Sequence, residues 1–162
     1  MNYFQLFNFP VSPLVDKSLL AQKYFELQKK FHPDFFTQSS DEEKEMALQQ
    51  SADINKAFAV FKNEEKTIEY FLLLKGFIEA GEKYQLPPDF LMQMMELNET
   101  LDEKDGVTLA AEMAALEKEW YAEIEQLLQQ PGLEENSAAM EKLKAYYYKK
   151  KYLKRILERL GD

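Results

Sequence analysis

The sequence predicts an all-α protein in two parts, an N-terminal helical hairpin followed by a C-terminal three-helix bundle. Only 5 Gly and 6 Pro occur in 162 residues, whereas Leu, Lys, Glu, Gln, Ala and Met, which favour helices, are abundant. Apolar residues also recur at helical spacing along most of the chain. With 46% hydrophobic and 14% aromatic residues, the chain can bury one good core or two small ones.

Four helices are expected in the N-terminal part. The second begins at Asp16, a residue type suited to the N-cap position, and extends to Phe31. Its apolar stripe should face the third helix, so these two helices are expected to form an antiparallel hairpin. The expected ranges are 3–9, 16–31, 41–62 and 64–80, and the stripe consists of Leu20, Tyr24, Leu27 and Phe31.

A linker is expected over residues 82–88, where Pro87 and Pro88 interrupt the helical pattern. Beyond it, Asp89 is expected to cap the first of three longer helices. Each of these helices has an amphipathic face that needs a neighbour, so a three-helix bundle is the natural packing. The expected helices are 89–103, 108–130 and 136–160, and the expected parts of the chain are 1–81, the linker 82–88 and 89–162.

The composition argues against several classes of function. A net charge of −9 disfavours binding to a nucleic-acid backbone, which needs a basic surface. The absence of cysteine removes disulfides and thiolate ligands, and it fits a reducing compartment. No apolar run approaches membrane-spanning length, and no metal-binding or phosphate-binding motif occurs. We therefore expect a cytoplasmic protein with no cofactor, no metal site and no nucleic-acid or membrane partner.

The tripeptide His32-Pro33-Asp34 contains the only histidine of the chain and lies where the second helix should end. Proline disfavours helical backbone angles in the residue before it, so His32 is expected to be extended and the helix to stop at Phe31. The tripeptide would then expose an imidazole and a carboxylate together at the tip of the hairpin. On its own, it also fits a simple helix stop.

The second helix is expected to show solvent a basic side. Lys29 lies nearly opposite the apolar stripe, and Lys23 and Lys30 lie together on its flank. Such lysines fit a solvated helix face. With the tripeptide beside them, they also fit a surface that attracts an acidic partner.

Five sequence motifs follow one another in a specific order. They are Tyr3-Phe4-x-Leu6-Phe7, Lys29-Lys30-Phe31-His32-Pro33-Asp34, Ile54-Asn55-Lys56-Ala57-Phe58, Tyr70-Phe71-Leu72-Leu73-Leu74-Lys75-Gly76 and Phe90-Leu91-Met92-Gln93-Met94-Met95-Glu96-Leu97. The first four resemble a J-domain of the HscB type, and the fifth resembles the start of the HscB C-terminal domain. Two features depart from the family pattern: Phe35 follows the tripeptide where Lys is usual, and Phe25 and Glu26 stand where J-domains are often basic.

The resemblance implies a co-chaperone of iron-sulfur cluster assembly rather than an enzyme. A J-domain, here residues 1–81, docks on a DnaK/HscA-class ATPase chaperone and stimulates ATP hydrolysis by that partner. The C-terminal domain is expected to bind the iron-sulfur scaffold protein (IscU-like) on which clusters are built. The residues expected to contact the ATPase chaperone are His32, Pro33, Asp34, Lys23, Lys29 and Lys30.

The helix that follows the linker has more apolar residues than one core stripe requires. Leu91, Met92 and Met95 lie about 100° to 200° around the helix from the core stripe, which consists of Phe90, Met94, Leu97 and Leu101. Exposed methionine-rich surface commonly marks a partner site. The alternative is a wide apolar face that packs against both other helices of the bundle.

The resemblance assigns the positions of Leu91, Met92 and Met95 to scaffold binding. In the family a further aromatic residue on the last helix usually joins this patch. Gapless matching puts Ala145 at that position, and Tyr148, nearby on the same face, is expected to take its place.

Two other functions remain open. The bundle can be an adaptor for a different protein client, with the J-domain recruiting a general chaperone, and the identity of the bound client discriminates between these functions. An enzyme such as a helical hydrolase or metal oxidase is the weakest interpretation. A di-iron bundle needs Glu three residues before His, and Lys29 occupies that position.

Overall fold

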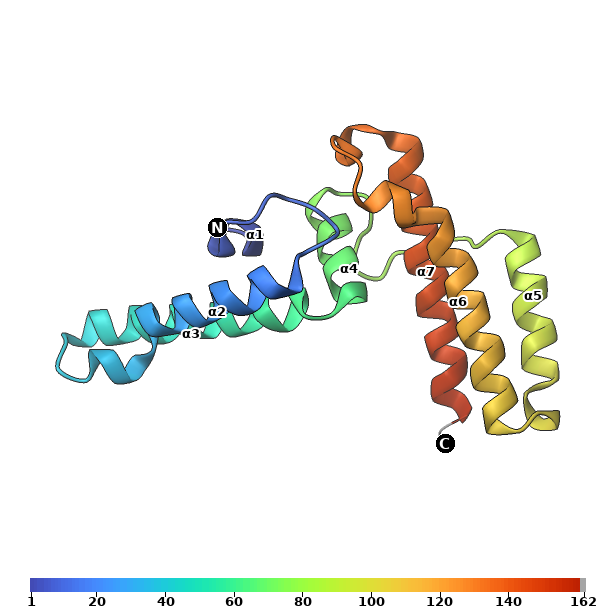
Figure 1. Cartoon of the computed structure of the whole chain (residues 1–162), viewed down its shortest axis with the longest axis horizontal. Helices are drawn as coiled ribbons and strands as arrows, with labels where there is room; N and C mark the ends of the chain where they lie inside the picture. Colours follow the sequence, from blue (N-terminus) through green and yellow to red (C-terminus); the bar gives the residue numbers. More distant parts are fainter. Residues whose placement is uncertain (161–162) are drawn as a thin grey trace. The chain divides into compact units, whose positions relative to one another are not determined.

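The computed structural model describes residues 1–160, and every regular element in that range is an α-helix or a short 3₁₀ helix (Figure 1). The predicted all-α class is therefore confirmed. The contacts divide the chain into two compact units, Met1–Phe71 and Leu72–Asp162, and the division falls within helix α4 (Glu64–Leu74). Each unit is described by itself.

Helix α1 (Tyr3–Phe7) is held at both ends by local hydrogen bonds. The Asn2 side chain accepts from the Gln5 N–H at 2.9 Å, and the Gln5 side chain accepts from the Asn2 N–H at 2.9 Å. Asn8 then takes left-handed backbone angles, with φ of 55°, and ends the helix. The helix is therefore two residues shorter than the expected range of 3–9.

Helices α2 (Lys17–Phe31) and α3 (Asp41–Phe61) form the predicted hairpin (Figure 1). Asp16 caps α2 as predicted and accepts from two backbone N–H groups at 2.9 and 3.1 Å. Between the helices, the Tyr24 ring stacks on Phe58 with centroids 4.1 Å apart, and its hydroxyl donates to Asn55 at 2.8 Å. The sequence did not predict the 3₁₀ helix η1 (Pro33–Phe36) at the tip.

The core of the N-terminal unit is a cluster of aromatic rings around Phe61, the last residue of α3. The Phe61 side chain is fully buried, and the rings of Phe4 and Phe7 lie 5.1 and 5.6 Å from it. Tyr3 stacks on Tyr70 of α4 at 4.6 Å, and its N–H donates to the Tyr70 hydroxyl. These contacts join α1, α3 and α4, and edge and tilted ring packing adds to the burial energy.

Helix α4 ends at Leu74, six residues earlier than expected. Gly76 takes a left-handed conformation with φ of 75°. Its N–H donates to the Leu73 carbonyl and the Phe77 N–H donates to the Leu72 carbonyl, at 3.1 and 3.0 Å. This bonding pattern closes a helix C-terminus, and Gly adopts the required angles without strain.

The C-terminal unit contains the predicted three-helix bundle, with its helices side by side in Figure 1. Phe90 of the first helix joins all three, because its ring lies 5.4 Å from Trp120 of the second and 5.9 Å from Tyr152 of the third. The elements are α5 (Pro88–Glu99), η2 (Leu101–Glu103), α6 (Gly106–Leu128), η3 (Leu133–Glu135) and α7 (Ser137–Leu160).

The expected cap of α5 was wrong. Pro87 occupies the N-cap position and Pro88 the first helical position, where the missing N–H of proline is harmless. Asp89 lies inside the first turn, where its carboxylate still complements the positive end of the helix.

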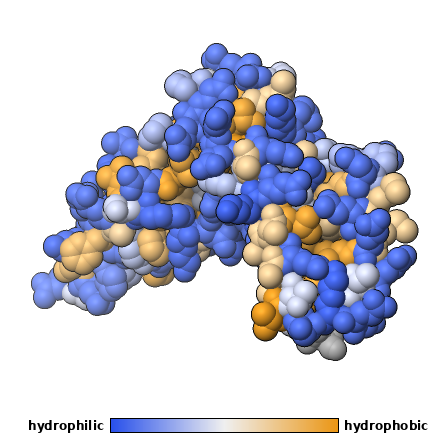
Figure 2. Space-filling model, turned by 45° about the vertical axis from the view of Figure 1, so that its right-hand side comes forward, coloured by the Kyte–Doolittle hydropathy of each residue, from blue (hydrophilic) through white to orange (hydrophobic). Residues whose placement is uncertain are grey.

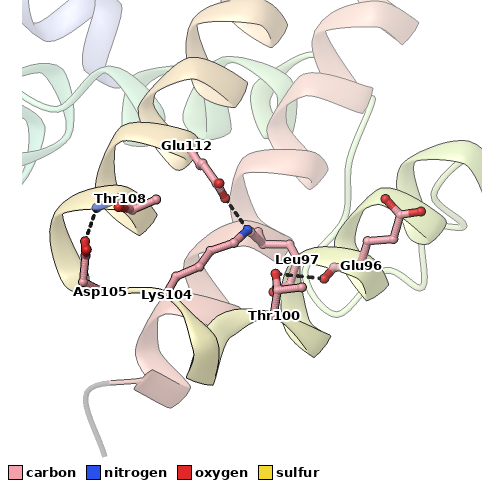
Figure 3. Close-up of polar contacts among 7 residues, drawn as sticks. All are labelled: Glu96, Leu97, Thr100, Lys104, Asp105, Thr108 and Glu112. Atoms are coloured by element: carbon pink, nitrogen blue, oxygen red, sulfur yellow. Dashed lines mark hydrogen bonds and ion pairs between the residues drawn. The ribbon is translucent and has the colours of Figure 1, made fainter.

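The connection between α5 and α6 is closed by short-range polar contacts (Figure 3). The Thr100 hydroxyl donates to carbonyls in the last turn of α5 at 3.2 Å, and the Lys104 ammonium lies 2.5 Å from the Glu112 carboxylate. Asp105 accepts from the Thr108 N–H at 2.6 Å, so α6 begins two residues earlier than expected. The same hydrogen bond holds the pKa of Asp105 below its ordinary value.

The aromatic cluster predicts a large loss of stability when Phe61 is truncated. Phe61→Ala removes a fully buried ring at the meeting point of three helices, so we expect a loss of about 3–5 kcal/mol in the free energy of unfolding. Urea unfolding followed by circular dichroism measures it. The matched control Met46→Ala, on the same helix but 67% exposed, should change stability little. Equal losses in both variants would contradict this view of the core.

Candidate functional site

The tripeptide lies at the tip of the hairpin, as the sequence predicted. His32 has extended backbone angles, φ −62° and ψ 133°, so α2 stops at Phe31. The side chains of His32 and Asp34 are 46% and 86% exposed, and no residue of η1 is buried. An imidazole and a carboxylate are therefore presented together to solvent.

Within the tip, the imidazole ring also fixes the turn. The His32 Nδ1 accepts a hydrogen bond from the Asp34 N–H at 3.2 Å, and the Asp34 carboxylate lies 3.6 Å from the same nitrogen. A neutral imidazole that accepts at Nδ1 carries its proton on Nε2. The ring therefore presents a donor on the side opposite the turn.

The three candidate lysines differ in position and exposure. Lys29 and Lys30 are exposed in the last turn of α2, directly before the tripeptide, and their ammonium groups lie 4.6 and 5.2 Å from the ring centroids of Phe25 and Phe31. Lys23 is less exposed than these two lysines, because it is half-buried, and it lies about two turns earlier in the helix. The cationic surface next to the tripeptide thus comes mainly from Lys29 and Lys30.

The second candidate surface lies on the bundle. The side chains of Met92 and Met95 are 64% and 60% exposed, whereas Met94 between them is fully buried. Leu91 is half-buried, and the expected core stripe of Phe90, Met94, Leu97 and Leu101 is buried throughout. The helix therefore has one apolar face in the core and a second apolar face in solvent. In Figure 2, hydrophobic residues are visible at the surface among hydrophilic ones.

A groove of about 450 Å³ borders this apolar face. Leu91 of α5 and Tyr148 of α7 both line it, so the structure brings these two predicted residues together. Met92 and Met95 do not line it. The other candidate on α7, Ala145, instead borders a separate cavity of about 70 Å³ beside Trp120.

The other residues that line this groove were not predicted as site residues, and they include Tyr84, Tyr152 and Arg155. The last two could have been found, because positions 148, 152 and 155 share one face of a helix. Tyr84 gave no such signal. It lies in the segment expected to be a linker, and it stacks on Tyr148 with centroids 4.4 Å apart and planes 9° apart.

The stacked tyrosines belong to a polar cluster that fixes the expected linker on α7. Glu82 accepts a hydrogen bond from the Tyr148 hydroxyl, and its carboxylate lies 3.0 Å from the Lys144 ammonium. These two contacts, that of Tyr148 first, hold the pKa of the Glu82 carboxyl below its ordinary value. Burial, followed by the charge of Glu141, raises the pKa of the Tyr84 hydroxyl.

The described part of the chain offers little for other kinds of site. Among residues 1–160, no group of three or more His, Cys, Asp or Glu side chains is placed to hold a metal ion. No helix in that range is both long enough and apolar enough to cross a membrane. The tip of the hairpin and the apolar face of α5 remain the candidate sites.

Comparison with solved structures shows which class of protein has this fold. The chain superimposes on the chaperone HscB from Vibrio cholerae with a TM-score of 0.65 and 32% identity, over 99% of both chains. It also superimposes on the human co-chaperone HscB with a TM-score of 0.75 and 30% identity, over 100% of this chain and 84% of the other. The fold is that of a co-chaperone.

Sequence comparison agrees. The family model of the HscB C-terminal oligomerisation domain matches residues 86–161. A co-chaperone HscB homologue from Vibrio cholerae is 36% identical over 100% of this chain and 98% of its own length, and one from Photobacterium profundum is 37% identical over 89% of this chain and 90% of its own. The chain belongs to the HscB family of co-chaperones.

The Glu82 cluster predicts a specific pH dependence. The ionised carboxylate is favoured in the folded protein, so its contribution to stability is complete above the ordinary pKa of 4.5 and is lost as pH falls through the lower folded-state value. Glu82→Gln should therefore be less stable than the wild type at pH 7, and the difference should shrink toward pH 3. Urea unfolding across this pH range measures it.

The Tyr148 hydroxyl provides the control for this prediction. In a Tyr148→Phe background the largest cause of the pKa shift is absent, so the pH dependence of the Glu82→Gln effect should be smaller. A difference between wild type and Glu82→Gln that is constant from pH 7 to pH 3 would contradict the cluster.

Proposed function

We propose that this protein delivers an iron-sulfur cluster scaffold protein to a DnaK/HscA-class ATPase chaperone and stimulates ATP hydrolysis by that chaperone. The proposal rests above all on the exposed His32-Pro33-Asp34 tip, since neither the imidazole nor the carboxylate is needed for the core. Catalysis belongs to the partner. This chain supplies contacts that bring the partner to its hydrolysing state.

The tip is suited to directional recognition. Pro33 restricts the turn, and the hydrogen bond from the Asp34 N–H orients the imidazole, so little conformational entropy is lost when a partner binds. The Asp34 carboxylate can accept charge-assisted hydrogen bonds from a basic residue of the chaperone. The exposed Lys29 and Lys30 speed and orient the encounter with acidic groups nearby. Lys23 adds to the same field from further along the helix.

The bundle supplies the client site in this proposal. Leu91, Met92, Met95 and Tyr148 form the scaffold surface, with the two methionines as adaptable anchors and the groove beside Leu91 and Tyr148 as its border. We assign the J-domain to residues 1–81 and scaffold binding to 89–162. The segment 82–88 joins them in sequence, and its first residues belong physically to the bundle.

The first test changes the tip. His32→Gln should abolish stimulation of the ATPase while leaving helical content and scaffold binding intact, because the side chain is exposed. Steady-state ATP hydrolysis and circular dichroism measure these effects. The control Thr37→Ala, at an exposed position just after η1, should stimulate as the wild type does. Undiminished stimulation by His32→Gln would refute the assignment of the tip.

The second test separates client binding from folding. Changing Met92 and Met95 together to Ser removes two apolar anchors, so scaffold affinity should fall by about 2 kcal/mol, or roughly thirtyfold. The unfolding midpoint and the scaffold-free ATPase stimulation should stay unchanged. Calorimetric titration with the scaffold and thermal unfolding measure both.

The matched control is Met94→Ser on the same helix. Because Met94 is fully buried, this change should cost about 2–5 kcal/mol in the free energy of unfolding. Wild-type affinity for the scaffold in a folded Met92/Met95 double variant would remove the proposed client site. Capture of a different client in its place would favour a general adaptor.

A further inference from the structure

Two exposed phenylalanine rings flank the tripeptide. Phe25 is 61% exposed and Phe35 is 67% exposed, among the highest values for large apolar side chains of the described residues. Neither ring reaches the aromatic core around Phe61. Single exposed apolar residues are common on proteins, so exposure alone carries no argument.

Each ring, however, contacts a residue of the proposed chaperone surface. The Lys29 ammonium lies 4.6 Å from the Phe25 ring centroid, within cation–π distance. The Phe35 ring lies 6.2 Å from the His32 ring, with the planes at 74°. These contacts hold both rings beside the polar groups while leaving more than half of each ring in solvent.

The helix geometry places these groups on one face. Phe25, Lys29 and His32 stand at i, i+4 and i+7, within about 60° of one another around α2. That face is opposite the stripe that packs on α3. Phe35 extends the row into η1 through its contact with His32. We call this row of Phe25, Lys29, His32 and Phe35 the aromatic stripe.

We infer that Phe25 and Phe35 are the apolar anchors of the ATPase chaperone on this chain, so that the aromatic stripe binds a chaperone surface in which apolar hollows alternate with carboxylates. This inference rests on the proposed function. The carboxylates follow from Lys29 within the stripe, and the hollows follow from two rings that are each more than half exposed.

If the aromatic stripe binds the chaperone, burial of the two rings should hold the complex together more than attraction between charges does. Burial of apolar rings is not screened by salt, whereas attraction between exposed charges is. The phenylalanines should therefore govern the dissociation rate, and Lys29 and Lys30 the association rate. A complex that depended on charge alone would show the opposite balance.

The experiment measures binding of the purified ATP-bound chaperone to the full chain by surface plasmon resonance, at several salt concentrations. Changing Phe25 and Phe35 together to Ala should weaken binding at least tenfold, mostly through faster dissociation, with the salt dependence and unfolding midpoint unchanged. Met46→Ala with Leu48→Ala is the matched control, since these side chains are 67% and 60% exposed on α3 of the same unit. The control should bind as the wild type does.

Changing both rings to Lys separates apolar from electrostatic recognition. If these positions serve an acidic partner surface, the Phe25/Phe35→Lys variant should bind more tightly at low salt than the wild type. The aromatic stripe predicts weaker binding at every salt concentration. Tighter binding by the lysine variant, or wild-type affinity in the alanine variant, would overturn the inference.

Two further measurements identify which proposal fails. If His32→Gln loses stimulation while the alanine variant binds normally, the aromatic stripe is wrong and the proposed function stands. If His32→Gln stimulates normally, the proposed function fails, and the inference falls with it. Sedimentation of the wild type tests a second copy of this chain as the occupant. A dimer that the alanine variant dissolves would also overturn the inference.

Discussion

The ring of Pro33 keeps the residue before it out of helical backbone angles, and the geometry of the hairpin follows from that restriction. His32 is extended, α2 ends at Phe31, and η1 turns the chain so that α3 returns along α2. The end of α3 then carries Phe61 into the rings of α1 and α4. At 1.5 Å per residue, the 15 residues of α2 hold the tip roughly 22 Å from the start of the hairpin. The exposed residues of the proposed chaperone surface and the buried rings around Phe61 therefore occupy opposite ends of the hairpin.

In the bundle, buried and exposed residues lie on different sides of one helix, whereas in the hairpin they lie at its two ends. On α5, Met94 is fully buried, and Met92 and Met95 are exposed, although all three have the same side chain. Their positions around the helix axis alone decide which of them is buried in the core and which is exposed to solvent. Phe90 fixes this rotation, because its ring is held between Trp120 and Tyr152. A rotation of α5 by about 100° about its axis would be needed to bury Met95 in place of Met94.

Local signals in the sequence predicted most of this structure. Helical periodicity and the side chain of Asp16 located α2, and the proline rule located its end. The exposure of Met92 and Met95 followed from their angle to the core stripe. Two expectations failed: apolar periodicity extended α4 to residue 80, although the helix ends before Gly76, and Asp89 was expected to cap α5, although Pro87 occupies the N-cap position. The position of Tyr84 could not be predicted, because it depends on where an irregular segment meets a helix distant in sequence.

The hydrogen bonds of Glu82 have a consequence for how the connection between the two parts can vary. A proline-containing segment suggests a spacer whose length is free to change. Here the carboxylate of Glu82 and the ring of Tyr84 are already attached to α7, so an insertion between them would detach one or the other. Because Ile78 is also buried, added residues should be tolerated better between Ile78 and Glu82, where the entropic cost of a longer loop grows slowly. The stretch that can lengthen during evolution, or in an engineered fusion, thus lies before the prolines.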